Sequence, residues 1–141
     1  MNTTSDTNFV FVRHGQGCHN AVRPLSRNSN LSIVQQKKLK KYLSIYDPEL
    51  TQIGENASIV NGKLVETFFN KVYQVTDFNQ INAIDVVGCS PLIRSMETAY
   101  YMTRKWKYPP AKIYVFPLLR EIDEHSNNIY SKESRQKLID T

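Results

Sequence analysis

Three short apolar runs, each ending at polar or turn-forming residues, limit most strongly how this chain can fold. They cover residues 9–12 (FVFV), 83–89 (AIDVVGC) and 112–116 (KIYVF). β-Branched and aromatic residues dominate these runs, which is typical of strands. Helical patterns lie between them, so strands and helices succeed one another along the chain. This order predicts an α/β fold, a parallel-sheet sandwich with helices on both faces, in one domain over residues 1–141.

Helix signals stand between the apolar runs and after them. We expect helices over residues 33–46, 51–69 and 90–105, a final short helix from residue 131, and a loop over residues 15–30. Thr51 and Ser90 are suitable N-caps, and Pro91 suits the first turn of a helix. The Asp47-Pro48 pair ends the first of these helices.

The composition indicates an ordinary globular domain. Hydrophobic residues make up 40% of the chain and charged residues 22%. No apolar run approaches the ~20 residues that a membrane span needs, and the N-terminus is polar rather than a basic and apolar leader. We therefore expect a cytoplasmic protein with no membrane partner. Its two cysteines form no disulfide framework.

The net charge of +5 and the pI of ≈ 9.2 fit an anionic partner, either nucleic acid or a small anionic substrate. Much of the excess lies in residues 37–41 (KKLKK) and around Lys105, patterns typical of solvated helix faces. No nucleic-acid motif or aromatic-flanked basic stripe accompanies them. We therefore expect no nucleic-acid partner, and a basic nucleic-acid-binding domain is the third of our hypotheses.

Polar side chains follow each predicted strand at its carboxyl end. Arg13 and His14 follow the first strand. Ser90 and Arg94 follow the second, and Glu121 lies a few residues after the third. Ligands of open parallel sheets bind beyond the carboxyl ends of the strands. The three clusters therefore predict one site at a common edge of the sheet.

The residue types at this edge are those that phosphoryl transfer requires: cations around the phosphoryl oxygens, a nucleophile and an acid. Arg13 and Arg94 can bind phosphate through their planar guanidinium forks. Two guanidiniums disfavour a cationic imidazole, so His14 can act as a neutral nucleophile. Asn20 can add an uncharged donor, and Glu121 can serve as general acid.

Three rival motifs fail on their spacing. The Gly-Gln-Gly turn lacks the third glycine of a dinucleotide fingerprint. Cys89 and Arg94 form Cys-x4-Arg, one residue short of the Cys-x5-Arg loop of cysteine-dependent phosphatases. His14, Cys18 and His19 place three candidate metal ligands in one loop, with no second pair elsewhere. The residues therefore favour none of these three chemistries.

Four blocks of the sequence carry a family resemblance. They are VRHGQGCHN (12–20), DPELTQIGENAS (47–58), CSPLIRSMETA (89–99) and FPLLREI (116–122). In order and spacing they resemble the histidine phosphatase superfamily, in its phosphoglycerate mutase-like branch. The resemblance extends over roughly residues 8–122, and the first and third blocks together are its most specific part.

This resemblance implies an enzyme, either a phosphatase or a phosphomutase, that acts on a small phosphorylated metabolite through a phosphohistidine. His14 would be the phosphorylated nucleophile, and Arg13 and Arg94 would hold the phosphoryl group. Asn20 would assist them, and Glu121 matches the position of the proton donor. No metal or organic cofactor is implied.

The chain departs from the family pattern after these blocks. The family has a second catalytic histidine, usually in a His-Gly pair after a later strand. Here no His-Gly pair follows residue 15, and the later histidine, His125, lies shortly after Glu121. We therefore expect a fold that is incomplete at its C-terminus. The alternative hypothesis is a pseudoenzyme that binds phosphate without the second histidine.

Overall fold

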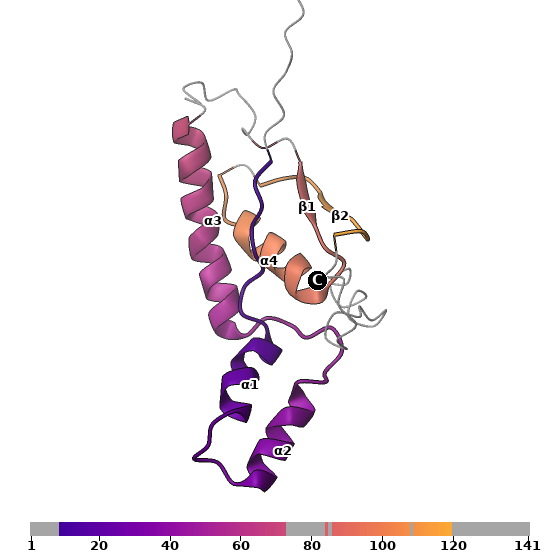
Figure 1. Ribbon diagram of the computed structural model, residues 1–141. Helices are drawn as coiled ribbons and strands as arrows, with labels where there is room; N and C mark the ends of the chain where they lie inside the picture. Colours follow the sequence, from indigo (N-terminus) through magenta and orange to yellow (C-terminus); the bar gives the residue numbers. More distant parts are fainter. Residues whose placement is uncertain (1–8, 73–83, 85, 108, 120–141) are drawn as a thin grey trace, which may run out of the picture.

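The computed structural model describes residues 9–72, 84, 86–107 and 109–119. Its elements, in chain order, are α1 Cys18–Ser26, α2 Ile33–Tyr42, α3 Gln52–Val72, β1 Val87–Cys89, α4 Ile93–Thr103 and β2 Ile113–Val115 (Figure 1). Four helices and a parallel pair of strands make this an α/β arrangement, as the sequence predicts. None of these four helices is long and apolar enough to cross a membrane.

β1 and β2 form a two-stranded parallel sheet in which Val87 pairs with Ile113 and Cys89 with Val115. Both strands lie within predicted runs but are shorter than predicted. Parallel neighbours need a crossover connection, and α4 lies in that connection and packs on both strands (Figure 1). The amide of Phe116 extends the ladder by donating to the carbonyl of Cys89 at 2.9 Å. The strand–helix–strand unit predicted for this part of the chain is therefore present.

The prediction of a buried first strand over residues 9–12 is wrong for the described chain. The segment belongs to no strand, and its four side chains are 52–87% exposed. A strand forms only where its backbone groups find a neighbouring strand, and among the described residues β1 pairs with β2 alone. Apolar composition can favour extended backbone but cannot supply the neighbour. A larger sheet with helices on both faces is accordingly not part of the described structure.

The segment predicted as a loop (residues 15–30) contains α1, so that prediction is wrong. The reason is that its glycine and asparagine act as helix caps instead of turn residues. Gly17 is the N-cap, and its amide donates to Oδ1 of Asn20 at 3.0 Å. α2 begins at a similar device, a capping box between Ser32 and Gln35, and ends four residues earlier than predicted.

Caps also set the starts of α3 and α4. Oγ1 of Thr51 accepts from the amide of Gly54 at 3.1 Å, which confirms the predicted cap of α3. α4 begins at Ile93, later than the predicted Ser90, and the Ile93 amide donates to Oδ1 of Asp47 at 2.7 Å. Asp47 is 2% exposed, and its φ of 43° lies in the left-handed region. The cap of α4 thus comes from a distant part of the chain, which no local pattern indicates.

The core of the described residues forms where α3 packs against α4, with Leu92 and Ile93 each only 2% exposed. Nε1 of the buried Trp106 donates to the carbonyl of Gly62 at 2.8 Å, which ties the end of α4 to α3. A Cβ atom on Gly62 would overlap the carbonyl of Met102. The missing side chain therefore allows the two helix backbones to approach, and this contact positions α4.

Candidate functional site

Hydrogen bonds from two distant segments hold the Arg-His-Gly loop. The amide of Gly15 donates to Oγ1 of Thr98, on α4, at 2.9 Å. The carbonyl of Gln16 accepts from the amide of Thr51, just before α3, at 2.9 Å. The loop backbone that carries His14 is therefore fixed between the middle of α4 and the residue before α3.

His14 lies against the guanidinium of Arg94. Nε of Arg94 donates to Nε2 of His14 at 3.1 Å, and Nδ1 of His14 lies 2.7 Å from the carbonyl oxygen of Gly15. An arginine N–H can only donate, and a carbonyl oxygen can only accept. The two contacts together require a proton on Nδ1 and a lone pair on Nε2. This tautomer is neutral, and its Nε2 can act as a nucleophile.

Arg94 has a relative exposure of 0%, which is rare for a cation. Thr98 lies four residues later on α4, and so on the same helix face. Its Oγ1 donates to the carbonyl of Arg94 at 2.7 Å and accepts from the amide of Gly15. The Arg-x-x-x-Thr spacing therefore puts two residues on one face of α4: Arg94, which contacts His14, and Thr98, which holds the loop that carries His14.

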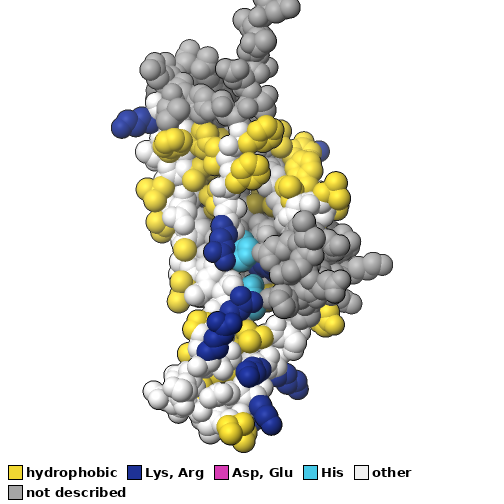
Figure 2. All heavy atoms as spheres, in the orientation of Figure 1, with side chains coloured by type: hydrophobic (Ala, Val, Ile, Leu, Met, Phe, Trp, Pro, Cys, Tyr) yellow, Lys and Arg dark blue, Asp and Glu magenta, His cyan; other side chains and the backbone are white. Residues whose placement is uncertain are grey.

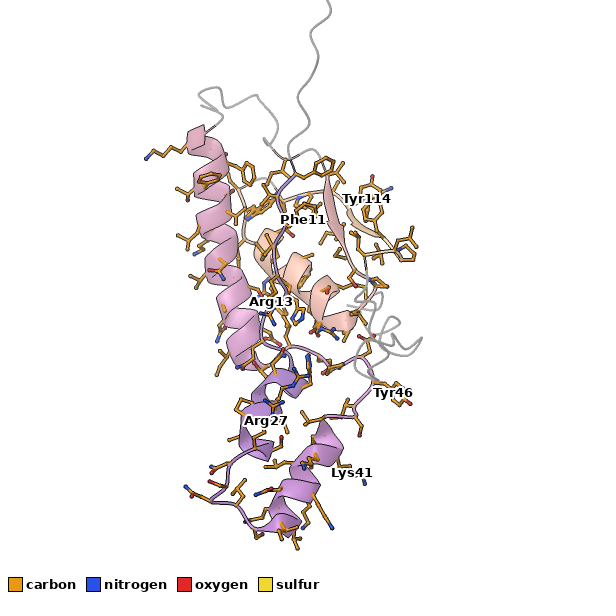
Figure 3. All side chains as sticks on the ribbon, in the orientation of Figure 1. Phe11, Arg13, Arg27, Lys41, Tyr46 and Tyr114 are labelled. Carbon is orange, nitrogen blue, oxygen red and sulfur yellow. The ribbon has the colours of Figure 1, made fainter. Side chains whose placement is uncertain are left out.

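Arg13 and Asn20 lie on either side of His14 in the sequence. Arg13 is exposed and lies where the extended N-terminal segment reaches the level of α4 (Figure 3). Asn20 is half-buried in the first turn of α1, where its Oδ1 accepts from the amide of Gly17. This bond uses the carboxamide oxygen and leaves the NH₂ group as a donor for an anion. Figure 2 shows Lys and Arg side chains close to both histidines of this region.

The predicted general acid falls outside the described part of the chain. Glu121, His125 and the helix predicted from residue 131 all lie outside the described residues. The structure therefore brings His14 and Arg94 into contact and places Arg13 and Asn20 on neighbouring elements. The roles predicted for Glu121 and His125 stay predictions.

Sequence reasoning missed Glu97, which holds the segment just before α3. Its Oε2 accepts from the amide of Leu50 at 2.7 Å. Burial raises the pKa of this carboxyl, and the nearby carboxylates of Glu49, Glu55 and Asp47 raise it further, against the lowering effect of the Leu50 hydrogen bond. A single glutamate inside a helix gives no sequence signal for such a role.

The rival chemistries gain no support from the described residues. Cys89, the thiol of the Cys-x4-Arg spacing, is 6% exposed, and burial raises its pKa to about 11. A thiol with this pKa stays protonated at neutral pH and is a poor nucleophile. The described ranges contain no group of three or more His, Cys, Asp or Glu residues that could hold a metal ion.

Comparison of the chain with protein-family models, with curated proteins and with solved structures finds no match. Three of the four sequence blocks meet there: VRHGQGCHN, DPELTQIGENAS and CSPLIRSMETA are joined by the hydrogen bonds around Gly15, Gln16 and Arg94.

Replacing Thr98 with valine is expected to destabilise the fold by about 1–3 kcal/mol, because the amide of Gly15 loses its acceptor without a change of shape. Urea unfolding gives the free energy, and amide exchange at Gly15 is expected to become faster. Thr98→Ser, which keeps the hydroxyl, is the control, and its free energy of unfolding is expected to fall less than that of Thr98→Val. Equal stability of Thr98→Val and the wild type would show that the bond does not hold the loop.

Proposed function

We propose that this protein is a phosphoglycerate mutase-like histidine phosphatase that transfers a phosphoryl group of a small phosphorylated metabolite through a phosphohistidine at His14. One observation carries the proposal: His14 is the neutral tautomer with its Nε2 lone pair directed at the buried guanidinium of Arg94. A nucleophile and a phosphate-binding cation in direct contact are the minimum that phosphoryl transfer on nitrogen needs.

In the proposed reaction, a phosphate monoester displaces Nε2 of His14 from the Arg94 donors. The phosphoryl oxygens then occupy those donors together with Arg13 and the NH₂ group of Asn20. The lone pair of Nε2 forms the N–P bond while the ester P–O bond breaks, and the leaving oxygen takes a proton from the predicted acid, Glu121.

The carbonyl of Gly15 supports this step, because it accepts from Nδ1 of His14 and so stabilises the positive charge that the ring gains. The phosphohistidine then loses its phosphoryl group either to water, as in a phosphatase, or to a second hydroxyl, as in a phosphomutase. In both outcomes the steps described use side chains and backbone groups of the protein.

The same contact favours a second candidate function. Nε of Arg94 donates to Nε2 of His14 at 3.1 Å, so this hydrogen bond engages the lone pair of Nε2. A protein that binds a phosphorylated ligand without turning it over would keep these residues for their charge and shape alone. A phosphate-binding pseudoenzyme is therefore the alternative.

The first experiment is intact-mass spectrometry of the wild type and of His14→Ala after brief incubation with a phosphoryl donor and a quench at neutral pH. We expect a single phosphoryl adduct that is lost in acid and that His14→Ala does not form. His125→Ala is run beside them, because this change tests whether the later histidine takes part.

An adduct that turns over in water identifies a phosphatase, and one that passes to an added acceptor identifies a phosphomutase. A folded chain that binds inorganic phosphate but forms no adduct with any donor would replace the proposal with the pseudoenzyme. An adduct that persists in His14→Ala would contradict the assignment of the nucleophile.

A further inference from the structure

The hairpin formed by α1 and α2 carries a concentrated positive charge. Residues 7–46 contain no aspartate or glutamate. The exposed cations of this stretch are Arg13, Arg23, Arg27, Lys37, Lys38, Lys40 and Lys41. Every described carboxylate lies later in the chain, from Asp47 onward. Figure 2 shows Lys and Arg side chains running from the histidines over this hairpin, with no Asp or Glu on that face.

This charge differs from that of an ordinary solvated helix, on which both signs are usually interspersed. The lysines of α2 repeat at spacings of three and four residues, which brings like charges together and disfavours the helix. No residue of α2 is buried and only Gln36 and Leu39 are half-buried, so little packing offsets this repulsion. The cap formed by Ser32 and Gln35 holds its start instead. An anionic partner would relieve the repulsion that the hairpin carries.

Apolar side chains are exposed among these cations. Ile33 is 72% exposed and Val34 is 65% exposed at the start of α2. Near its end, a shallow depression of about 390 Å³ is lined by Lys38, Lys41, Tyr42 and Ile45. Figure 3 shows Lys41 on α2 and Tyr46 just beyond it. A partner that complements this surface therefore carries apolar groups as well as negative charge.

Among anionic partners, an acidic polypeptide fits this mixture best. Inorganic phosphates and polyphosphate have no apolar groups to place against Ile33 and Val34. Single-stranded nucleic acid binds mainly through aromatic stacking platforms. Two exposed side chains of this surface, Tyr42 and Tyr46, are aromatic, but most of its exposed apolar side chains are aliphatic: Leu25, Ile33, Val34 and Ile45. Helices of 9 and 10 residues are about 14 Å and 15 Å long, which an extended segment of roughly five residues spans.

We propose that the α1–α2 hairpin is a docking surface for an acidic segment of a partner protein, in which apolar residues are interspersed among Asp and Glu. The inference goes beyond the proposed phosphoryl transfer and does not depend on it. The surface is small and exposed, so the complex is of the transient kind, with an affinity that falls as salt is added.

The test measures fluorescence anisotropy of a short labelled peptide of Glu-Glu-Leu repeats mixed with the full chain. A peptide of the same length with Gln in place of Glu is the uncharged control. We expect the double variant Lys38→Glu/Lys41→Glu to weaken binding of the acidic peptide at least about tenfold. The matched control is Lys63→Glu/Lys71→Glu, which makes the same charge change at two exposed lysines of α3. It is expected to weaken binding less than about twofold.

Circular dichroism checks that both double variants keep the helical content of the wild type. Equal weakening by both would show that net charge alone drives binding and would overturn the docking surface. So would absence of binding, or equal binding of the two peptides. Tighter hairpin-dependent binding of a labelled oligonucleotide or of vesicles with anionic lipid would replace the acidic protein by that partner.

The docking surface and the proposed phosphoryl transfer can be tested separately. His14→Ala is expected to bind the acidic peptide as the wild type does, because the docking surface lies on the hairpin. Peptide binding in a chain that never forms a phosphohistidine would uphold the docking surface and remove the proposed enzyme. A phosphohistidine without peptide binding would do the reverse.

Discussion

Replacing Arg94 with leucine is expected to slow phosphohistidine formation by about 10²–10³-fold. Arg94 is fully buried and its Nε lies 3.1 Å from Nε2 of His14, so the leucine variant removes the cation in contact with the proposed nucleophile. Leucine occupies much of the same space without a charge. The rate of adduct formation in a single turnover, followed by intact mass, is the measurement.

Two further variants identify the property that matters. Arg94→Lys keeps the charge but not the planar fork, and an intermediate loss is expected. Arg104→Leu removes an arginine at the C-terminal end of the same helix, whose guanidinium lies 4.5 Å from the ring centre of Tyr101. This control is expected to change the rate less than about twofold. A wild-type rate in Arg94→Leu would show that the arginine is structural.

The same variant has a readout that does not depend on turnover. Arg94 requires the lone pair on Nε2 of His14, so its loss leaves Gly15 alone to select the tautomer. The nitrogen resonances of the imidazole report which ring nitrogen carries the proton. We expect one neutral tautomer in the wild type and a mixture in Arg94→Leu. An unchanged tautomer would show that the Gly15 contact is sufficient.

Replacing Gly62 with alanine is expected to destabilise the chain by about 3 kcal/mol, or roughly 10 °C in Tm. Helix propensity alone predicts the opposite sign, because alanine is better than glycine inside a helix by about 1 kcal/mol. The added Cβ would overlap the carbonyl of Met102, so α3 and α4 must move apart. The Gly62 carbonyl would then lose its hydrogen bond from Trp106.

The control for this change is Asn61→Ala, at an exposed position next to Gly62 on the same helix. At this exposed position no backbone overlap opposes the higher helix propensity of alanine, so a small gain in the free energy of unfolding is expected. Urea or thermal unfolding of both variants gives the comparison. If Gly62→Ala were as stable as the wild type, the α3–α4 contact would not be as close as the structure has it.

Much of the second half of the described fold was accessible from local pattern. The sequence predicts α3 with its Thr51 cap, α4 and the two strands that flank it, and their parallel pairing follows from the strand–helix–strand order. The strand predicted over residues 9–12 failed because a strand needs a neighbour, which composition cannot supply. α1 was missed because Gly17 and Asn20 serve equally well as turn residues and as caps.

In the candidate site too, some features could be predicted from the sequence and others could not. The sequence predicts that His14 and Arg94 lie close together from the rule that parallel strands meet their ligands at one edge. The strand over residues 9–12 is not among the described strands, so hydrogen bonds from Arg94 and Thr98 of α4 make the contact instead. Asp47 and Glu97 escaped prediction because each acts on a backbone amide that is distant in sequence. No spacing rule connects such partners.

The sequence by itself determined what depends on neighbours within a few residues: the apolar periods, the cap at Thr51, and the spacing that puts Arg94 and Thr98 on one face. Only the tertiary structure decided the tautomer of His14, the cap of α4 and the need for glycine at residue 62. The physical reason is range. A hydrogen bond or a steric overlap acts over a few ångströms, and here its two partners are separated by 40 to 80 residues of chain.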